Sequence, residues 1–331
     1  MPDELSRWAA RRAPEVLARA EAEAVEELKR ALLRASLQER SGARRDPRKA
    51  NVAQPTPLHG DGVWAYCVAL AGEKLPDHMP GVHAASSVEL IEQTPLAALI
   101  SRVPLAEFGE EPLRRNLNDL DWLARVARSH EAVLEQALQQ ATIVPLRLCT
   151  IFEDTGGVRR MLEEQRSALV AALEQLSGHQ EWGVKLLVDR EALEAAARPA
   201  GSEAETQPDD LDQRSAGSAY LVRRRFEREV REAADRLAVT VAEEVHARLQ
   251  DWASDAVLSP PQNRDLSGHE GEMLLNGAYL VETPKVGRLR ELVGELQERH
   301  RALGIRLELT GPWPPYNFVS HDPTAEGAAL G

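Results

Sequence analysis

Histidine and glycine residues are the first places to look for chemistry in this sequence, and none completes a known catalytic or binding pattern. His130-Glu131 is followed by Ala-Val-Leu, so the second histidine of a helical HExxH zinc site is missing. Gly156-Gly157 is not followed by the Lys-Ser/Thr pair of a phosphate-binding loop. A Gly-x-Ser-x-Gly nucleophile elbow and a GxGxxG dinucleotide-binding turn are also absent. We therefore expect a protein that is not an enzyme and has no catalytic, cofactor-binding or metal-binding residues.

His130 and the two cysteines are better explained as structural residues. His130 lies on the apolar side of a predicted helix, which favours a buried, hydrogen-bonded imidazole. Cys67 and Cys149 are the only cysteines, and each is flanked by apolar residues in a strand-like segment. Two isolated cysteines cannot supply a zinc site, and a reducing compartment disfavours a disulfide. Both thiols are therefore expected to be buried and unreacted.

The most informative pattern is a run of prolines and aromatic residues near the C-terminus, at 310–319. Pro312, Pro314 and Pro315 remove three backbone donors, and each proline fixes φ near about −65°. We therefore expect the run to leave the sheet as an extended, polyproline-like segment. Its aromatic side chains either fold back and seal the core of their own domain or help to form a partner surface. For Trp313 we expect the first arrangement, with the ring buried against the C-terminal sheet.

The elements that hold these residues can be predicted from apolar periodicity. Short apolar runs predict strands, and apolar residues spaced three and four apart predict helices. For an N-terminal α+β domain at 61–178 we expect strands at 63–70, 82–90, 96–103 and 142–148, and helices at 114–140 and 158–176.

In the second half of the chain the predicted strands and helices follow one another in a clearer order. Its elements follow the order strand-helix-strand-strand-helix-strand, which predicts a ferredoxin-like βαββαβ domain at 179–320. A polar run at 195–218 predicts a disordered loop inside this domain. We expect strands at 182–188, 256–258, 273–281 and 305–309, and helices at 219–253, interrupted near 240, and at 286–303.

Residues 1–58 are predicted to be a helical extension followed by a flexible basic linker. Apolar residues at helical spacing cover 17–35, and prolines, glycines and arginines dominate from 41 to 60. We expect this extension to be dispensable for folding. The last segment, 321–331, is expected to be a disordered tail. The fold class is therefore α+β, with two domains and an N-terminal helical extension.

Composition and charge exclude several classes of protein. No apolar stretch approaches the roughly 20 residues that a membrane span needs, and the N-terminus lacks the features of a secretory signal. We expect a cytoplasmic protein that does not enter a lipid membrane. Residues 1–58 carry 12 Lys/Arg and 9 Asp/Glu, whereas the remaining residues carry 28 and 44. Because the residues after 58 are this acidic, they repel phosphate groups, and nucleic acid is not an expected partner.

Several short strings occur in an order that resembles one known family. They begin with Val63-Trp64-Ala65-Tyr66 and end with Leu-Thr-Gly-Pro-Trp-Pro-Pro-Tyr-x-Phe-Val at 309–319. Between these ends lie Trp122, Ser129–Leu134, Val144–Phe152, Glu181–Lys185, Ala219–Arg224 and Ala278–Val281. Over about residues 61–320 the chain resembles the GvpL/GvpF family of gas vesicle proteins. Two departures are residues 1–58, which have no counterpart, and Cys149, which replaces a glycine common in the family.

The resemblance implies a non-catalytic accessory protein that binds the major, hydrophobic gas vesicle shell protein and assists assembly. Other gas vesicle accessory proteins are implied as further partners, and the cytoplasm and the gas vesicle as its locations. The alternative is a scaffolding or regulatory protein that shares the fold without a vesicle role. The family-motif residues, which are candidates for a partner surface, are Trp64, Tyr66, His130, Pro145, Arg147, Thr150, Trp182, Tyr220, Tyr279, Gly311, Trp313, Pro315, Tyr316 and Phe318.

Overall fold

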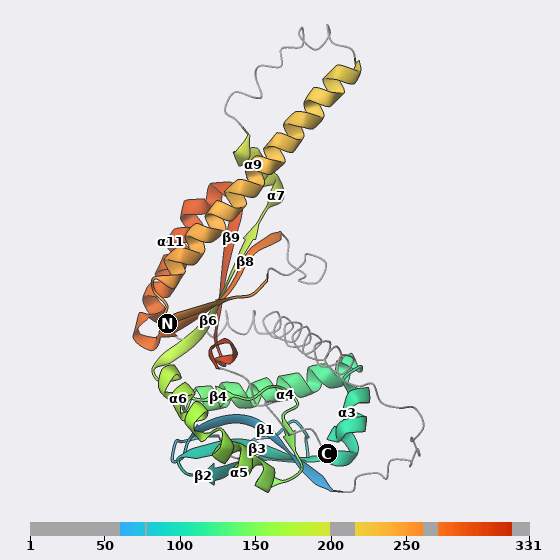
Figure 1. Ribbon diagram of the computed structural model, residues 1–331, viewed down its shortest axis with the longest axis vertical. Helices are drawn as coiled ribbons and strands as arrows, with labels where there is room; N and C mark the ends of the chain where they lie inside the picture. Colours follow the sequence, from blue (N-terminus) through green and yellow to red (C-terminus); the bar gives the residue numbers. More distant parts are fainter. Residues whose placement is uncertain (1–59, 77, 199–215, 261–270, 320–331) are drawn as a thin grey trace, which may run out of the picture. The chain divides into compact units, whose positions relative to one another are not determined.

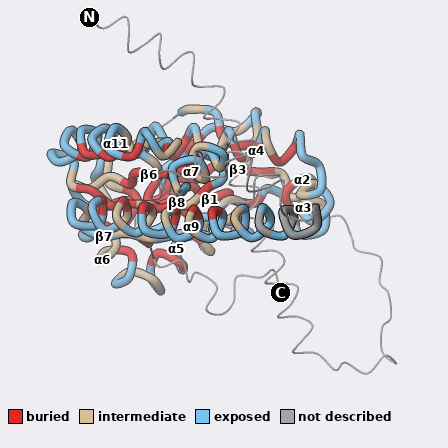
Figure 2. The backbone as a smooth tube through the Cα atoms, turned by 90° about the horizontal axis from the view of Figure 1, so that it is seen from above, coloured by how far each residue is buried: buried red, intermediate tan, exposed pale blue. Residues whose placement is uncertain are grey.

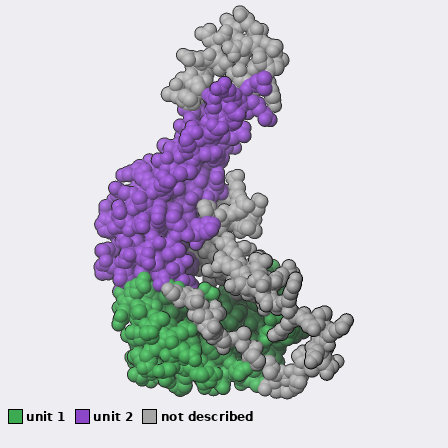
Figure 3. Space-filling model, in the orientation of Figure 1, with its two compact units in different colours: residues 1–177, 319–331 green, residues 178–318 purple. Residues whose placement is uncertain are grey.

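The computed structural model describes residues 60–76, 78–198, 216–260 and 271–319, with the side chains of 216–220 and 222 excepted. The chain mixes helices with two antiparallel sheets, as the α+β assignment predicted. It divides into two compact units, residues 1–177 with 319–331 and residues 178–318 (Figure 3). The helix and linker expected at 1–58, the tail expected at 321–331 and most of the loop expected at 195–218 lie outside the described residues.

The sheet of the first unit is built around one fully buried strand. Its members are β1 (Asp61–Leu70), β2 (Val88–Gln93), β3 (Leu96–Pro104), β4 (Val144–Pro145) and β5 (Ile151–Phe152). They follow the order β2-β3-β1-β4, and β5 also pairs with β1. Every residue of β1 from 62 to 69 is buried. Because side chains alternate between the two faces of a strand, both faces of β1 must be covered, which explains its continuous apolar run.

Five helices in the described part of the first unit accompany this sheet. They are α2 (Leu105–Phe108), α3 (Glu110–Asn116), α4 (Leu120–Leu138), α5 (Thr155–Glu164) and α6 (Arg166–Leu176). The single helix expected at 114–140 is wrong, because Asp119 begins a new helix. Its side chain accepts hydrogen bonds from the backbone nitrogens of Asp121 at 3.0 Å and Trp122 at 3.2 Å. The helix expected at 158–176 is likewise two helices, separated at Gln165.

Two expected strands of this unit are shorter than the sequence suggested. Of the strand expected at 82–90 only the end from Val88 onward joins the sheet, because the preceding backbone bonds elsewhere. Val82 N donates to the Tyr66 hydroxyl, and Gly81 N donates to Ser86 O. Of the strand expected at 142–148 only β4 pairs, since the chain then enters a tight turn.

The second unit holds a four-stranded antiparallel sheet. Its strands are β6 (His179–Val188), β7 (Asp255–Leu258), β8 (Glu272–Glu282) and β9 (Ile305–Trp313), in the order β7-β8-β6-β9. Its helices are α7 (Arg190–Ala197), α9 (Ala216–Gln250) and α11 (Val286–His300), with short 3₁₀ turns at Thr283–Lys285, Arg301–Leu303 and Tyr316–Phe318 (Figure 1). The expected order of strands and helices is present, and α7 is an element that the sequence reading missed.

The core of this unit lies between the helices and one face of the sheet. Along α9 the buried residues recur at three- and four-residue spacing, and along α11 buried and exposed residues alternate at the helical period (Figure 2). Trp182, Val184, Leu186 and Val188 contribute the matching face of β6. The α9 core residues are Val230, Ala234, Ala238, Val241, Val245 and Leu249.

The interruption expected in α9 near residue 240 does not occur. Thr240 is β-branched, but its hydroxyl donates to the carbonyl oxygen of Arg236 at 3.0 Å, one turn earlier. This bond lets threonine stay within a helix. The expected disordered loop also overlaps helices at both of its ends, because α7 includes 195–197 and α9 begins at Ala216.

The proline run does not leave the sheet where the sequence predicted. Strand β9 continues through Pro312 to Trp313, which pairs with Glu181 after a register shift. Because β9 has a strand on one side only in the described sheet, a proline there need not break a ladder hydrogen bond. The chain departs only at Pro314.

Among the described residues, no helix is sufficiently long and apolar to cross a bilayer.

Candidate functional site

A buried aromatic cluster around His130 unites family-motif residues from strand β1 and helix α4. Strand β1 supplies Trp64 and Tyr66, and helix α4 supplies His130. Trp64 Nε1 donates to His130 Nδ1 at 3.0 Å, and His130 Nε2 lies 3.3 Å from the carbonyl oxygen of Leu146. Because Nδ1 accepts, the proton must reside on Nε2, which donates to Leu146. The imidazole is therefore neutral and bonded at both nitrogens.

Tyr66 completes this cluster. Its ring stacks on that of His130 with centroids 5.3 Å apart. Its hydroxyl accepts from Val82 N at 2.8 Å and shares a 2.7 Å hydrogen bond with Ser101 Oγ. Burial lowers the pKa of His130 to about 4 and raises the pKa of Tyr66. Both groups are thus held neutral, an arrangement suited to packing rather than to proton transfer.

A tight turn after β4 explains three more motif residues. The carbonyl oxygen of Arg147 accepts from Thr150 N at 3.1 Å and from the Thr150 hydroxyl at 2.7 Å. The carbonyl oxygen of Thr150 in turn accepts from Ala65 N at 2.9 Å, which fastens the turn to β1. Pro145 is buried opposite Cys67, whereas the Arg147 side chain is exposed.

Cys149 occupies the third position of this turn with a φ of 65°. Such a left-handed position favours glycine, which is the residue that the family resemblance places here. Cys67 and Cys149 are both free thiols; Cys67 is buried and Cys149 half-buried. Burial raises the pKa of each to about 12, in line with unreacted thiols.

Replacing each cysteine by glycine should therefore give different results. Cys149→Gly relieves the left-handed strain while losing a small apolar contact, so its unfolding free energy should stay within about 1 kcal/mol of the parent. Cys67→Gly removes a packed side chain from a central strand and should cost about 2–4 kcal/mol. Urea unfolding of both variants measures the contrast. If both variants lost the same unfolding free energy, the left-handed conformation assigned to Cys149 in the turn would be contradicted.

In the second unit the proline-aromatic run packs against the start of β6. The Trp313 Nε1 donates to Thr310 Oγ1 at 3.0 Å, and a Cβ added to Gly183 would lie 2.8 Å from the same Oγ1. Glycine at 183 thus leaves room for this pair. Trp313 lies against the sheet, as expected, but it is half-buried, so the expected burial of its ring is only partial.

Trp182 and Gly311 form the close contact beside it. Trp182 is buried, with the Arg290 guanidinium 5.0 Å from the centre of its ring. Gly311 has a φ of 129°, and a Cβ there would lie 3.0 Å from Glu181 O and 3.2 Å from the Trp182 ring. The backbone at 311 therefore approaches the tryptophan as only glycine permits.

Glu181 and Asn317 fasten the end of the run, and neither was singled out from the sequence. The buried Glu181 carboxylate accepts from Asn317 N at 3.1 Å and from Asn317 Nδ2 at 2.6 Å. Of the motif residues next to Asn317 in the sequence, Pro315 and Phe318 are buried and Tyr316 is half-buried. The signal available in the sequence was an acidic residue next to a motif tryptophan.

The remaining motif residues of this unit lie on β8 and α9. Tyr279 is fully buried in the core, and its hydroxyl lies 3.0 Å from His246 Nδ1 on α9. Burial raises the pKa of Tyr279. Tyr220 is in α9, but its side chain lies outside the described part of the chain.

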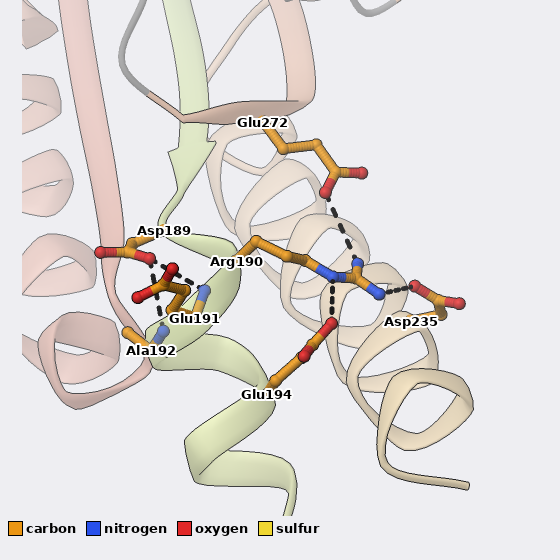
Figure 4. Close-up of polar contacts among 7 residues, drawn as sticks. All are labelled: Asp189, Arg190, Glu191, Ala192, Glu194, Asp235 and Glu272. Carbon is orange, nitrogen blue, oxygen red and sulfur yellow. Dashed lines mark hydrogen bonds and ion pairs between the residues drawn. The ribbon is translucent and has the colours of Figure 1, made fainter. Parts of the chain in front are cut away.

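A polar clamp at the start of α7 is a further cluster that the sequence reading missed (Figure 4). Asp189 begins the helix by accepting from the backbone nitrogens of Glu191 and Ala192. Arg190 then pairs with Glu194 at 3.1 Å, with Asp235 of α9 at 2.6 Å and with Glu272 of β8 at 3.5 Å. One half-buried guanidinium thus joins three elements.

No described part of the chain brings together three or more His, Cys, Asp or Glu side chains in a way that could hold a metal ion.

The family model for "Gas vesicle synthesis protein GvpL/GvpF" matches residues 62–320, well over half of the chain. The chain belongs to the GvpL/GvpF family. The family assignment that the motif strings suggested is therefore confirmed.

Individual GvpL/GvpF relatives agree with this assignment. Gas vesicle protein L of Streptomyces sp. (strain CB03234) is 36% identical over 245 residues, which cover 74% of this chain and 87% of the relative. Gas vesicle protein F of the same strain is 28% identical over 260 residues, which cover 74% of this chain and 93% of the relative. In this pair the L protein is the more similar.

Solved GvpF structures share the fold of this GvpL/GvpF chain. The crystal structure of GvpF from Anabaena sp. PCC7120 has a TM-score of 0.55 at 18% identity and covers 78% of this chain and 96% of that one. GvpF from Microcystis aeruginosa has a TM-score of 0.54 at 17% identity and covers 78% and 98%. At these identities the likeness concerns the fold alone.

Most of the GvpL/GvpF motif residues therefore fall into two groups, one in each unit, whereas Tyr220 and Tyr279 lie on α9 and β8. The first gathers Trp64, Tyr66 and His130, with the Arg147–Thr150 turn fastened to the same strand. The second gathers Trp182, Gly311 and Trp313 at the start of β6. Most of these side chains are buried or half-buried. Their use as a partner surface stays a prediction.

Proposed function

We propose that this chain is a non-catalytic assembly factor that binds the hydrophobic shell protein of gas vesicles and assists vesicle formation. Membership of the GvpL/GvpF family is the observation that carries the proposal. The burial and neutral state of its chemically capable motif side chains, such as His130 and Tyr66, agree with a structural use of these residues. Further gas vesicle proteins are the remaining proposed partners, and the vesicle and the cytoplasm the proposed locations.

We further infer that the second unit is a ferredoxin-like domain and that residues 61–178 and 179–320 are the two domains of the chain. The strand order β7-β8-β6-β9 supports the first inference, because it results from βαββαβ connections with the first and third strands at the centre. The division of the chain at residue 178 supports the second. A sheet of this kind leaves two edge strands.

Strand β7 offers the edge best suited to an apolar client. In the described sheet it has a neighbour on one side only, and β9 forms the other edge. Two exposed apolar side chains lie at its ends: Trp252, which precedes β7, is 38% exposed, and Leu258, its last residue, is 50% exposed. An open strand edge bordered by apolar side chains favours pairing with a strand of another protein. The net charge of −13 keeps such a complex dispersed.

Co-expression with a tagged shell protein from the same gene cluster tests the proposal. The parent chain should be retained on the affinity resin, and Trp252→Lys with Leu258→Lys should reduce retention about tenfold or more. Leu120→Lys is the matched control, because Leu120 is an exposed leucine of the first unit. If the parent chain were repeatedly absent from the eluate while both proteins were soluble, shell binding would be rejected. Equal retention of the parent chain and of both variants would reject only the β7 edge.

A further inference from the structure

No described residue covers the N-terminal part of α9 with a further layer. The helix has 35 residues, which corresponds to a length of about 50 Å. Its first buried residue in the described part is Val230, and the described side chains from 221 to 229 are exposed except for the half-buried Phe226. Figure 1 shows this end extending past the strands of its own sheet. We call residues 216–229 the α9 tip.

The α9 tip reverses the charge of the rest of the protein. Residues 216–229 contain four arginines and two glutamates, whereas the whole chain has a net charge of −13. The first turn of α9 holds no acidic residue, although the amino end of a helix carries a partial positive charge. Arginines and helix dipole thus add to one local positive potential, which weakens the isolated helix and favours an approaching carboxylate.

One side of the tip combines this charge with an apolar anchor. Leu221, Arg224, Arg225 and Arg228 follow the i, i+3, i+4, i+7 spacing of a single helix face, and all four are exposed. Leu221 is 67% exposed, the largest fraction among the exposed large apolar side chains of the described residues. We call these four residues the arginine face. By helical geometry it lies opposite Val230 and Ala234, which are both buried.

Two arginines of the arginine face make weak ion pairs along the helix. Arg225 pairs with Glu229 at 2.9 Å and Arg228 with Glu232 at 3.6 Å, in both cases with the arginine four residues before the glutamate. This order is the less favourable one on a helix. All four side chains are more than half exposed, so the pairs are screened and contribute little. A partner carboxylate can therefore share or replace the glutamates.

We propose that the arginine face binds an acidic helical segment of a partner protein, with Leu221 as the apolar anchor. A helix that carries carboxylates at the same three- and four-residue spacing, beside an apolar residue, would match both the charge and the geometry. The acidic remainder of the chain repels such a segment and so confines it to the tip. The Arg190 clamp, through Asp235, fixes the base from which the tip extends (Figure 4). This surface is separate from the β7 edge proposed for the shell protein.

Photo-crosslinking of the full chain tests this proposal. Benzoylphenylalanine is placed at position 221 or, as the control, at position 239, in cells that also express the other genes of the gas vesicle cluster. Val239 is an exposed apolar residue on the same helix, 56% exposed. It lies eighteen residues later, which is five turns and the same angular position. Position 221 should crosslink to a segment that has a net negative charge and helical periodicity, and position 239 should not.

Charge substitutions decide whether the arginines are responsible. Arg224→Glu, Arg225→Glu and Arg228→Glu together should reduce the crosslink at least tenfold, whereas the same three changes to lysine should preserve it. Raising the salt concentration should also lower the yield. The melting temperature should stay unchanged, because these side chains are exposed. A synthetic peptide of the crosslinked segment should bind the parent chain and not the glutamate variant.

Several results would overturn the proposal. They are a lack of crosslinking at 221, equal crosslinking at 239, capture of nucleic acid or of a second copy of this chain, and insensitivity to the glutamate changes. Shell-protein retention is measured on the same variants. If retention persists while the crosslink at 221 is absent, the arginine face fails as a docking surface and the proposed assembly function stands.

Discussion

His130→Ala should destabilise the first unit by about 3–5 kcal/mol, because it removes a buried ring and both of its hydrogen bonds. Trp64 Nε1 would lose its acceptor at 3.0 Å, and the Leu146 carbonyl would lose its donor. Both groups are in a part of the core where water cannot replace the imidazole, since His130 has no exposed surface. Thermal unfolding should shift downward by roughly 10 °C or more.

His83→Ala is the matched control in the same unit. His83 is half-buried, and its ring makes an edge contact with Phe108 at a centroid distance of 6.4 Å. We expect a loss below about 1 kcal/mol for this change. A double-mutant cycle with Trp64→Phe should show a coupling of about 1 kcal/mol or more between Trp64 and His130. An unchanged melting temperature for His130→Ala would contradict the structural role of the imidazole.

The same site should make stability depend on pH. Burial lowers the pKa of His130 from 6.5 to about 4 in the folded chain, so the unfolded chain binds a proton first as pH falls. The contribution of His130 to the free energy of unfolding is therefore complete above about pH 6.5. It is lost as the pH falls from about 6.5 to 4, at up to about 1.4 kcal/mol per pH unit. His130→Phe keeps an aromatic ring and should lack this slope. If the unfolding free energies of the parent and of His130→Phe depended on pH in the same way, the proposed role of His130 in the pH dependence would be refuted.

Gly311→Ala should destabilise the second unit by about 3–5 kcal/mol, from backbone strain together with overpacking. At a φ of 129° an L-residue is strained, and the new Cβ would lie 3.0 Å from the carbonyl oxygen of Glu181 and 3.2 Å from the Trp182 ring. Neither neighbour can move easily, because Glu181 is in the central strand β6 and Trp182 is in the core. The register of β9 beyond Thr310 should be lost.

Gly294→Ala provides the control with the opposite sign. Gly294 lies within α11, and a Cβ there would meet nothing within 4 Å. Alanine should therefore stabilise the helix by about 0.5–1 kcal/mol. Urea unfolding of the two variants, followed by tryptophan fluorescence, compares them directly. A loss below 1 kcal/mol for Gly311→Ala would show that the run is not packed against Trp182 as described.

Much of the fold followed from local patterns in the sequence. The alternation at 305–309 predicted a strand, and apolar spacing predicted α9 and α11, because periodicity records which side of an element is buried. The motif strings identified the family, which the family model and the relatives confirm. The same local reading missed the Asp119 cap that divides the expected helix at 114–140, although that signal was present in the sequence.

Other features depended on contacts between distant residues, and only the tertiary structure decided them. Trp64 and His130 are 66 residues apart, and Glu181 and Asn317 are 136 apart. Periodicity shows that a side chain is buried but not which side chain it meets, because that depends on strand register and on which face each helix covers. For the same reason Pro312 could remain in β9: whether a proline interrupts a sheet depends on whether its strand is at the edge, a property of the whole sheet.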